Sequence, residues 1–584
     1  MAASQSIQAL AVSPGIAIGH VMCLHRLVGK RPERRVVAES EVERELERLA
    51  DALKRTREQI TSLRDALRGR LDRAGVEIFD AHLLLVDDKA LNAAFAERIR
   101  SRKLCAEFAV FDSVEQFAAV FGEMSDEYLR ERAGDLRDVG SRILSNLTDA
   151  APELSFSGRR IVAAPTLAPS DTVQLDRSKV LGLAVEIGSA TSHTAILARS
   201  LRIPAVVGIP PELLDQLSAD DTMIIDGFSG KVIVNPDERT REAYRLKAKT
   251  AGEFLERLER DSALRPETTD GFIVEIAANI DARASYAEAR EVGAHGVGLF
   301  RTEFMFIDPA KIPGEDEQFE IYKKLLTDAG DDPVTVRTMD IGGDKSFSGV
   351  YRAPEENPFL GLRGIRLSLY ERRDLFRVQL RALLRAGVYG NLRVMLPMVT
   401  SVLEVEETRE FIAKLEEELR AGRTEFAPLS LGVMIETPAA ALLADKLAPL
   451  VDFFSVGSND LVQYTMAADR GNERVAYLYR PTHPAILRLI DCCVTAAKHN
   501  NIFVGVCGQM AGDPATAALL VGLGVHELSM SPGSVALIRR VIRSLSLHEA
   551  AQTARAAMEC RNAAESMKLV QQLLARRLPE LAAL

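Results

Sequence analysis

The spacing of hydrophobic residues changes along the chain and divides it into segments of different structure. Short apolar runs interrupted by Pro and Gly, up to about residue 28, predict β-strands. From Val42 to Leu71, Leu and Ile recur at steps of three, four and seven, which is the pattern of an apolar stripe along one long helix. Further helical patterns continue to about Leu147. We therefore expect a helical bundle over residues 29–147.

Short β-branched runs return after residue 159, each bounded by Pro, Gly or Asp. Because the first 28 residues also have strand character, residues 1–28 and 148–236 are expected to form one α/β domain into which the bundle is inserted. Gly227-Phe-Ser-Gly230 has the composition of a hairpin turn. Residues 237–266 carry dense alternating charge, which predicts a solvated helix that joins two domains.

Eight short apolar strands alternate with amphipathic stretches over residues 267–584. Their number and spacing predict a (β/α)₈ barrel, with an open doubly wound sheet as the alternative. Polar residues at the strand ends favour the barrel, because its catalytic face lies there; they are Arg301, Arg337, Glu436, Asp460 and Cys507. The expected fold is therefore a multidomain α/β chain, with a small α/β domain, an inserted helical bundle and a TIM-type barrel.

Composition and charge narrow the classes of function. With 584 residues the chain is too long for one core, so several domains are expected. The formal net charge of −10 argues against a general nucleic-acid or membrane-surface binder. No apolar run reaches about 18 residues, so no membrane insertion is expected. The six scattered cysteines and a start without signal-peptide features predict a reduced, cytoplasmic protein.

The barrel segment carries the residues for binding a small phosphorylated anion. Arginines near strand ends offer planar forks for phosphate or carboxylate; they are Arg301, Arg337, Arg363 and Arg470. Glu436 and Asp460 follow adjacent strands, and hard oxygen ligands without His or Cys suit Mg²⁺ or Mn²⁺. The alternative for both carboxylates is a buried salt bridge.

Three further residues have both a chemical and a structural interpretation. Cys507 is either a small buried hydrophobe or a proton carrier at a strand end. His193 follows a strand and opens a helix, where a phosphate on its imidazole would meet free backbone N–H groups. A structural role is the alternative for this histidine. His82 lies among apolar residues of the bundle, which indicates packing or recognition.

Long motifs in the chain resemble a known family. The run TSHTAILARSLRIPAVVG is similar to the phosphohistidine domain of phosphoenolpyruvate-utilising enzymes. Together with GLFRTEF, VRTMDIGGDK, EENPFLGLRGIR, VMIETPAA, SVGSNDLVQYTMAADRGN and CGQMAGD, it makes the chain resemble, nearly end to end, enzyme I of the phosphoenolpyruvate:sugar phosphotransferase system. That family has a swivelling phosphohistidine domain and a barrel that usually dimerises.

The resemblance implies a reaction and a role for each matching residue. Enzyme I takes the phosphoryl group of phosphoenolpyruvate onto a histidine in a Mg²⁺-dependent reaction and passes it to the carrier protein HPr. His193 matches the phosphorylated histidine, and Cys507 matches the proton donor to the enolpyruvate. Glu436 and Asp460 match the metal ligands, and the region around His82 matches the HPr-docking domain. The positions matching substrate contacts are Arg301, Arg337, Lys345, Arg363, Asn459 and Arg470.

Three positions depart from the family pattern. Ser189 replaces a glycine before the histidine motif, Ala168 replaces a threonine, and Gln509 replaces a glutamate after the cysteine. These three departures are the only support for the alternative that the chain is a paralogue that kept the fold as a regulatory or scaffolding protein without enzymatic activity. Pyruvate phosphate dikinase and phosphoenolpyruvate synthase need a nucleotide-binding domain, and no Gly-rich ATP loop is visible. A specialised enzyme I with a dedicated HPr stays open.

Overall fold

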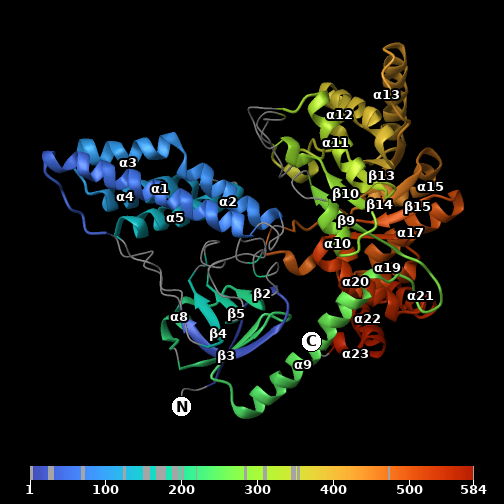
Figure 1. The fold of residues 1–584 in the computed structure, drawn as a ribbon. Coiled ribbons are helices and arrows are strands. Elements are labelled where there is room, and N and C mark those ends of the chain that lie inside the picture. The colour runs from blue at the N-terminus through green and yellow to red at the C-terminus, as the bar shows by residue number, and fades with distance from the viewer. Residues whose placement is uncertain are drawn as a thin grey trace. The chain divides into compact units, whose positions relative to one another are not determined.

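The computed structural model describes most of the chain and divides it into two compact units, Met1–Glu253 and Phe254–Ala583. Figure 1 shows the elements of each. The described residues are 4–23, 32–67, 73–122, 127–148, 158–165, 167, 179–186, 195, 198, 203–218, 220–281, 286–306, 312–342, 350, 355–470, 472 and 474–582.

Five helices in the first unit have a hydrophobic core of their own. They are α1 (Val42–Leu67), α2 (Arg73–Val86), α3 (Lys89–Arg102), α4 (Ala106–Gly122) and α5 (Glu127–Thr148). The predicted stripe of α1 is buried in this core at Val42, Leu49 and Ile60. A 3₁₀ turn, η1 (Glu39–Glu41), precedes α1, and the Glu41 carboxylate accepts a hydrogen bond from the Ala38 N–H. The bundle predicted from the apolar periodicity is confirmed.

An eight-stranded mixed sheet forms the other core of the first unit, in the order β1-β8-β7-β3-β4-β5-β6-β2. The strands are β1 (Gln5–Gln8), β2 (Leu10–Ser13), β3 (Ile16–Cys23), β4 (Arg160–Ala164), β5 (Val180–Val185), β6 (Ala205–Val207), β7 (Thr222–Asp226) and β8 (Lys231–Val234). Strand β3, before the helices, pairs in parallel with β4, which follows them, so the bundle is inserted between neighbouring strands of one sheet. β7 and β8 form the hairpin expected around residues 227–230. A short helix, α8 (Pro211–Gln216), packs on the sheet core through Leu213 and Leu214.

Helix α9 (Glu238–Arg260) follows the sheet and contains the boundary between the two units. In the first unit, Lys247 Nζ lies 2.7 Å from Asp226 Oδ2. In the second unit, Arg257 Nη1 lies 3.6 Å from Glu580 Oε1. The helix is not solvated on every side as its charge predicted, because Ala251 and Phe254 are buried. The turn η2 (Asp261–Ala263) follows it.

Eight parallel strands close into a barrel in the second unit, which excludes the open doubly wound sheet. They are β9 (Glu275–Asp281), β10 (Val297–Arg301), β11 (Val334–Arg337), β12 (Leu392–Leu396), β13 (Ser430–Ile435), β14 (Phe453–Val456), β15 (Phe503–Val506) and β16 (Glu527–Met530). β16 pairs with β9 and closes the ring. Because all strands run the same way, their carboxyl ends form one rim, which we call the mouth of the barrel.

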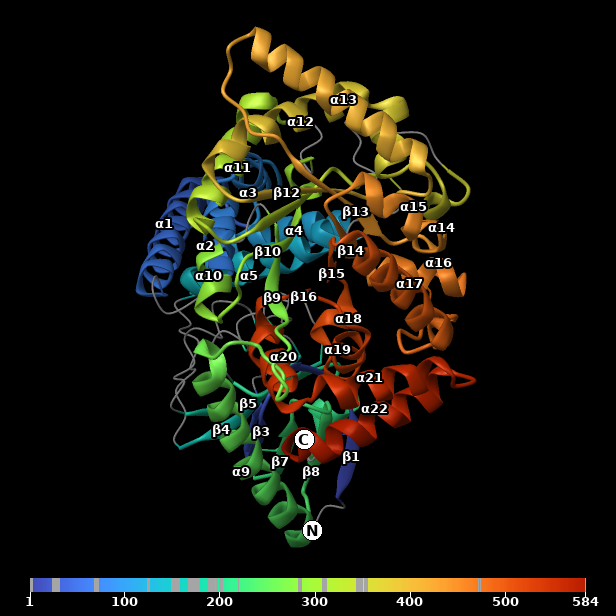
Figure 2. The same cartoon turned by 90° about the vertical axis from the view of Figure 1, so that its right-hand side faces the viewer.

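Helices follow the strands and cover the outside of the barrel, as Figure 2 shows for α11 to α13, α17 and α19 to α22. They are α10 (Tyr286–Glu291), α11 (Glu315–Ala329), α12 (Arg373–Ala386), α13 (Val402–Ala421), α14 (Pro438–Leu442), α15 (Ala444–Leu447), α16 (Ser458–Met466), α17 (Pro484–Asn500), α18 (Gln509–Gly512), α19 (Pro514–Leu523) and α20 (Pro532–Ser544). The chain continues with α21 (Leu547–Met558), α22 (Ala563–Arg577) and α23 (Pro579–Ala582). The short helical turns of this unit are η3 (Glu303–Phe306), η4 (Pro358–Leu360), η5 (Leu367–Glu371), η6 (Gly387–Tyr389), η7 (Ala448–Leu450) and η8 (Ala476–Leu478).

Two remaining sequence predictions concern the membrane and the cysteines. None of the described helices has the length and apolarity to span a membrane. All six cysteines are free thiols. Cys493 is buried in α17, whereas its neighbour Cys492 is exposed, since adjacent helical residues point in different directions.

Candidate active site

The predicted polar residues of the barrel meet at its mouth. Arg301 and Arg337 are the last residues of β10 and β11. Glu436 follows β13, Cys507 follows β15, and Asp460 lies in the first turn of α16 after β14. The strands carry these side chains to one rim because each apolar run ends just before its polar residue. The predicted placement of the five side chains at one face of a barrel is thus observed.

Two buried arginines at the mouth are held by carboxylates. Arg363 donates to both oxygens of Asp340, at 3.2 and 2.8 Å. Arg337 Nη1 lies 3.3 Å from Asp340 Oδ2, and Nη2 donates to Glu303. Burial alone would lower the pKa of Arg337, but Glu303 and Asp340 outweigh it and raise that pKa. Both guanidinium groups therefore stay charged.

Asp340 and Glu303 did not emerge from the sequence. Each lies within three residues of a predicted arginine, in VRTMD and FRTE. That spacing was a signal, because a carboxylate just beyond a strand end reaches the same rim as its neighbouring arginine.

Glu436 and Asp460 each have one buried carboxylate oxygen that accepts no hydrogen bond from the described residues. Glu436 Oε1 accepts a hydrogen bond of 2.6 Å from the Met398 N–H, while Oε2 has no hydrogen-bond donor among the residues that the structure describes. Asp460 Oδ1 likewise has no hydrogen bond within the described part, but lies 3.6 Å from Arg363 Nη1 and 3.9 Å from Arg470 Nη1. Burial raises the pKa of Glu436 to about 8, and the charges of Asp460 and Asp340 add to the rise.

These two carboxylates fit a hard divalent cation. Among the residues that the structure describes at the mouth, four buried acids, Glu303, Asp340, Glu436 and Asp460, face two buried arginines. A divalent cation balances that excess. Within the described ranges, no cluster of three or more His, Cys, Asp or Glu residues is placed to hold a metal. Mg²⁺ needs no such cluster, because it takes one or two carboxylates and completes its shell with water and substrate phosphate.

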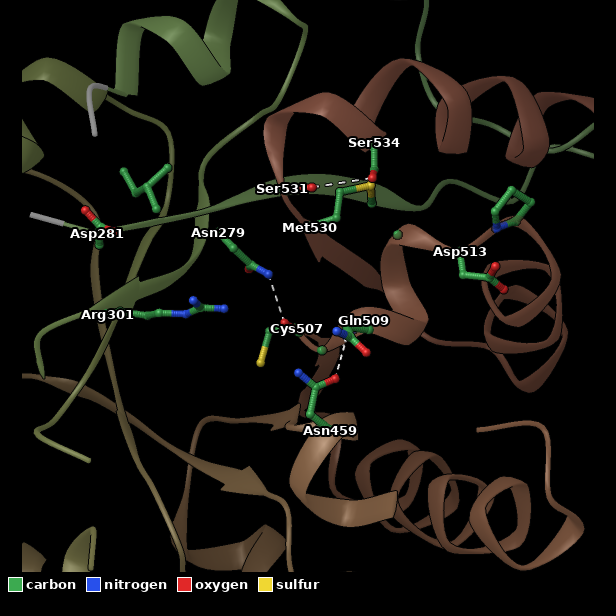
Figure 3. Close-up of a pocket in the computed structure, with 14 residues that line it drawn as sticks. Asn279, Asp281, Arg301, Asn459, Cys507, Gln509, Asp513, Met530, Ser531 and Ser534 are labelled. Carbon is green, nitrogen blue, oxygen red and sulfur yellow. Dashed lines mark hydrogen bonds between the residues drawn. The ribbon is translucent and has the colours of Figure 1, made fainter. Parts of the chain in front are cut away.

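A pocket of about 480 Å³ at the mouth is lined by Arg301, Asn459 and Cys507 (Figure 3). Arg301 is exposed and points into the pocket toward Cys507. Asn459 Oδ1 accepts a hydrogen bond of 2.8 Å from the Gln509 N–H. This bond orients the amide so that its NH₂ group remains for a ligand.

The Cys507 thiol is poised in its acid form. The side chain is 4% exposed, and Sγ donates to Val456 O at 3.7 Å. Burial raises the pKa of Cys507 to about 11, although Ser455 and Arg337 partly oppose the rise. The group therefore carries a proton at neutral pH, as a proton donor must.

The remaining predicted residues lie apart from this site or outside the described residues. His193, Lys345, Ser189 and Ala168 are in the second group. His82 is 1% exposed in α2, and its Nε2 lies 3.4 Å from Asp135 Oδ1 of α5. Its side chain ties two helices of the bundle together.

Comparisons with known proteins place the chain in a family. Three family models match it: the N-terminal domain of PEP-utilising enzymes at residues 8–132, their mobile domain at 156–230 and their PEP-binding domain at 256–547. The chain is 42% identical to the phosphoenolpyruvate-protein phosphotransferase of Geobacillus stearothermophilus, over 97% of this chain and 98% of the relative. It is also 42% identical to the enzyme of that name from Listeria monocytogenes, over 98% of this chain and 100% of the relative.

This similarity runs through all three predicted regions of the chain and agrees with the observed barrel. It confirms the family, the fold class and the class of enzyme that the sequence motifs predicted. The chain belongs to the phosphoenolpyruvate-protein phosphotransferase family, the enzyme I family.

Proposed function

We propose that this chain transfers the phosphoryl group of phosphoenolpyruvate to the carrier protein HPr through a phosphohistidine at His193, as the first step of the sugar phosphotransferase system. The observation that supports the proposal most is the mouth of the barrel. Buried carboxylates, arginines and a protonated thiol converge there beside a pocket of about 480 Å³. A small trianionic substrate that releases an enolate needs these groups together.

The arginines and Asn459 are proposed to hold phosphoenolpyruvate. Arg301 reaches into the pocket, and Arg337 is fixed by its carboxylate partners, so it presents a preorganised positive charge. Arg363, Arg470 and the amide of Asn459 complete the proposed contacts, together with Lys345. Phosphoryl transfer depends mainly on such positioning and charge neutralisation.

Glu436 and Asp460 are proposed to bind Mg²⁺. The support is Glu436 Oε2 and Asp460 Oδ1, which lack hydrogen-bond donors among the described residues, and the excess of buried carboxylates around them. These carboxylates would hold Mg²⁺ where it would supply positive charge for the substrate phosphate. Met398 fixes the orientation of Glu436 through the hydrogen bond to Oε1.

Cys507 is proposed to complete the reaction as the proton donor. When the bond between phosphorus and the enol oxygen breaks and a phosphorus–nitrogen bond forms at His193, the enolate of pyruvate remains. Its carbon takes the proton of the Cys507 thiol, which becomes a thiolate and regains a proton from water. A thiol with a pKa of about 11 is present in the required form throughout the neutral range.

The partners and the domain roles are inferred from the family. Residues 29–147 are proposed to dock HPr, with His82 shaping that region from inside because its ring is buried. Residues 1–28 and 148–236 carry His193, residues 237–266 link them to the barrel, and residues 267–584 bind substrate and form a homodimer. His193 must meet both the substrate and HPr, so its domain swings between them. A cytoplasmic location is consistent with six free cysteines.

The proposal is tested by labelling the purified chain with ³²P-phosphoenolpyruvate and Mg²⁺. We expect acid-labile, base-stable label on His193, transfer of that label to HPr, and no label on the His193→Ala variant. The His499→Ala variant is a matched control, because it also removes one histidine, which lies in the last turn of α17 and has no assigned role in the reaction. Label retained by His193→Ala would contradict the proposal.

A further inference from the structure

The turn that carries Cys507 is fixed by three hydrogen bonds from different parts of the barrel. The Cys507 N–H donates to Val456 O at 3.1 Å, and the Gln509 N–H donates to Asn459 Oδ1 at 2.8 Å. The third bond comes from Asn279 in β9, whose Nδ2 donates to the Cys507 carbonyl oxygen at 2.9 Å. Figure 3 shows the last two of these bonds at the edge of the pocket.

The bond from Asn279 replaces one that the sheet does not supply. The ladder between β15 and β16 ends at the pair Val506 and Leu528, so the Cys507 carbonyl lies beyond it. The next residue is Gly508, which is required here because a Cβ would lie 2.0 Å from Ser458 Oγ. A peptide between a strand end and a glycine rotates easily unless its carbonyl is held.

Asn279 is itself held in one orientation by Ser529 of β16. Ser529 Oγ donates to Asn279 Oδ1 at 2.6 Å, and Asn279 Nδ2 also donates to Ser529 O at 3.3 Å. Ser529 is fully buried. Both amide hydrogens of Asn279 are thus committed to the protein, although the residue lines the pocket. Its side chain is therefore suited to hold the turn rather than to bind substrate through these hydrogens.

We propose that Asn279, oriented by Ser529, is a positioning residue that holds the Cys507 turn so that the thiol faces the reacting carbon. The inference rests on the proposed role of Cys507 as proton donor. It adds that this donor is aimed from β9 and β16, two strands whose residues carry none of the assigned catalytic roles. Loss of the amide lets the Cys507–Gly508 peptide turn and moves Sγ away from the substrate.

The test measures proton transfer separately from phosphoryl transfer. In the full chain with Mg²⁺ and pyruvate in D₂O, the exchange of methyl protons reports removal and return of a proton at the carbon, and it does not involve His193. We expect Asn279→Ala and Ser529→Ala to slow this exchange at least tenfold. The exchange of label between phospho-HPr and His193 should keep its wild-type rate, and the KM for phosphoenolpyruvate should change less than threefold.

Two controls separate positioning from general damage. Ser566→Ala also removes a fully buried hydroxyl, one that bonds Ala557 O away from the mouth, and should leave every rate unchanged. The second control measures the rate at which iodoacetamide alkylates Cys507 in the metal-free protein at pH 9, as followed by mass spectrometry. This rate should rise several-fold in Asn279→Ala, because the freed turn exposes the thiol.

The outcomes distinguish this inference from the function on which it rests. Wild-type methyl exchange in Asn279→Ala, with exchange abolished in Cys507→Ala, would overturn the positioning role alone. Wild-type exchange in Cys507→Ala would remove the proposed proton donor itself, and the positioning role with it. Equal losses in the Asn279 and Ser566 variants would show a general effect on stability and would also overturn the inference.

Discussion

The two ends of the same barrel bury acidic and basic side chains in different ways. At the mouth, Glu436 and Asp460 lie near Arg337 and Arg363 beside an open pocket. At the opposite end, Glu527 is the first residue of β16 and is also buried, with Oε2 3.8 Å from Arg393 Nη1. A buried acid near an arginine is therefore not enough to identify a catalytic site.

The difference lies in the balance of charge and in the space around it. Arg393 stacks 4.9 Å from the ring centre of Phe503, and the Glu527 carboxylate lies against Gly298 and Gly505, where added Cβ atoms would come within 2.8 and 3.1 Å of Oε1. This end is packed with aromatic and backbone atoms. The mouth instead combines an excess of buried carboxylates with a cavity. At the mouth, a ligand can enter the cavity and neutralise the carboxylates. The closed end has no such space, so we expect its buried charges to affect stability and not ligand binding.

The largest expected effect separates Glu436 at the mouth from Glu527 at the closed end. Glu436→Gln should reduce phosphoenolpyruvate-dependent phosphorylation by about 10³-fold, because it removes a carboxylate metal ligand from the reacting centre. Glu527→Gln, the matched change at the closed end, should stay within about twofold of the wild type. Initial rates of label incorporation and Mn²⁺ binding followed by electron paramagnetic resonance check both variants. Equal rates in the two variants would show that the mouth is not the reaction centre.

The next effect compares two buried thiols of the second unit. Cys507→Ala should slow turnover by about 10²-fold while phosphoenolpyruvate still binds, since only the proton donor is lost. Cys493→Ala is the matched control, because burial also raises the pKa of Cys493, but that residue lies in α17 with its Sγ bonded to Leu489 O. Steady-state kcat and a direct titration of substrate binding check the prediction. A loss of binding together with kcat would assign Cys507 to substrate contact instead.

The comparison also shows which parts of the molecule local sequence patterns encode. Strand residues such as those before Arg301 and Glu436 are buried in continuous apolar runs, so the runs predicted the eight strands and the rim where they end. Pairings that close the barrel were not predictable in this way. Asn279 and Ser529 lie 250 positions apart and meet only because β16 pairs with β9.

The start of α1 shows that spacing alone does not identify a helix cap. Ser40 and Glu43 have the S-x-x-E spacing of a capping box, but Ser40 lies inside the turn η1, and the Glu41 carboxylate accepts the hydrogen bond from the Ala38 N–H. The spacing that points to Asp340 is ambiguous in the sequence alone, because an aspartate three residues after an arginine also occurs on ordinary surfaces. Only the barrel shows that Asp340 bridges Arg337 and Arg363.

The smallest expected effect concerns the stability of the closed end. Burial raises the pKa of Glu527 from 4.5 to about 7; Arg393 opposes this rise and Glu275 adds to it. The folded chain therefore binds this proton more tightly than the unfolded chain does. The stability that the proton contributes is complete below pH 4.5 and is lost as the pH rises to 7, by about 3 kcal/mol.

Glu527→Gln should remove this loss, because glutamine keeps the shape of the neutral acid at every pH. Relative to the wild type, the melting temperature of the barrel in the variant should rise by about 4 °C between pH 5 and pH 8. Calorimetry of the two full-length proteins at both pH values measures the change, and subtracting one from the other cancels groups that titrate in both. If the melting temperatures of variant and wild type differ by the same amount at pH 5 and pH 8, Arg393 keeps Glu527 ionised at both pH values. The closed end would then hold an ion pair like those at the mouth.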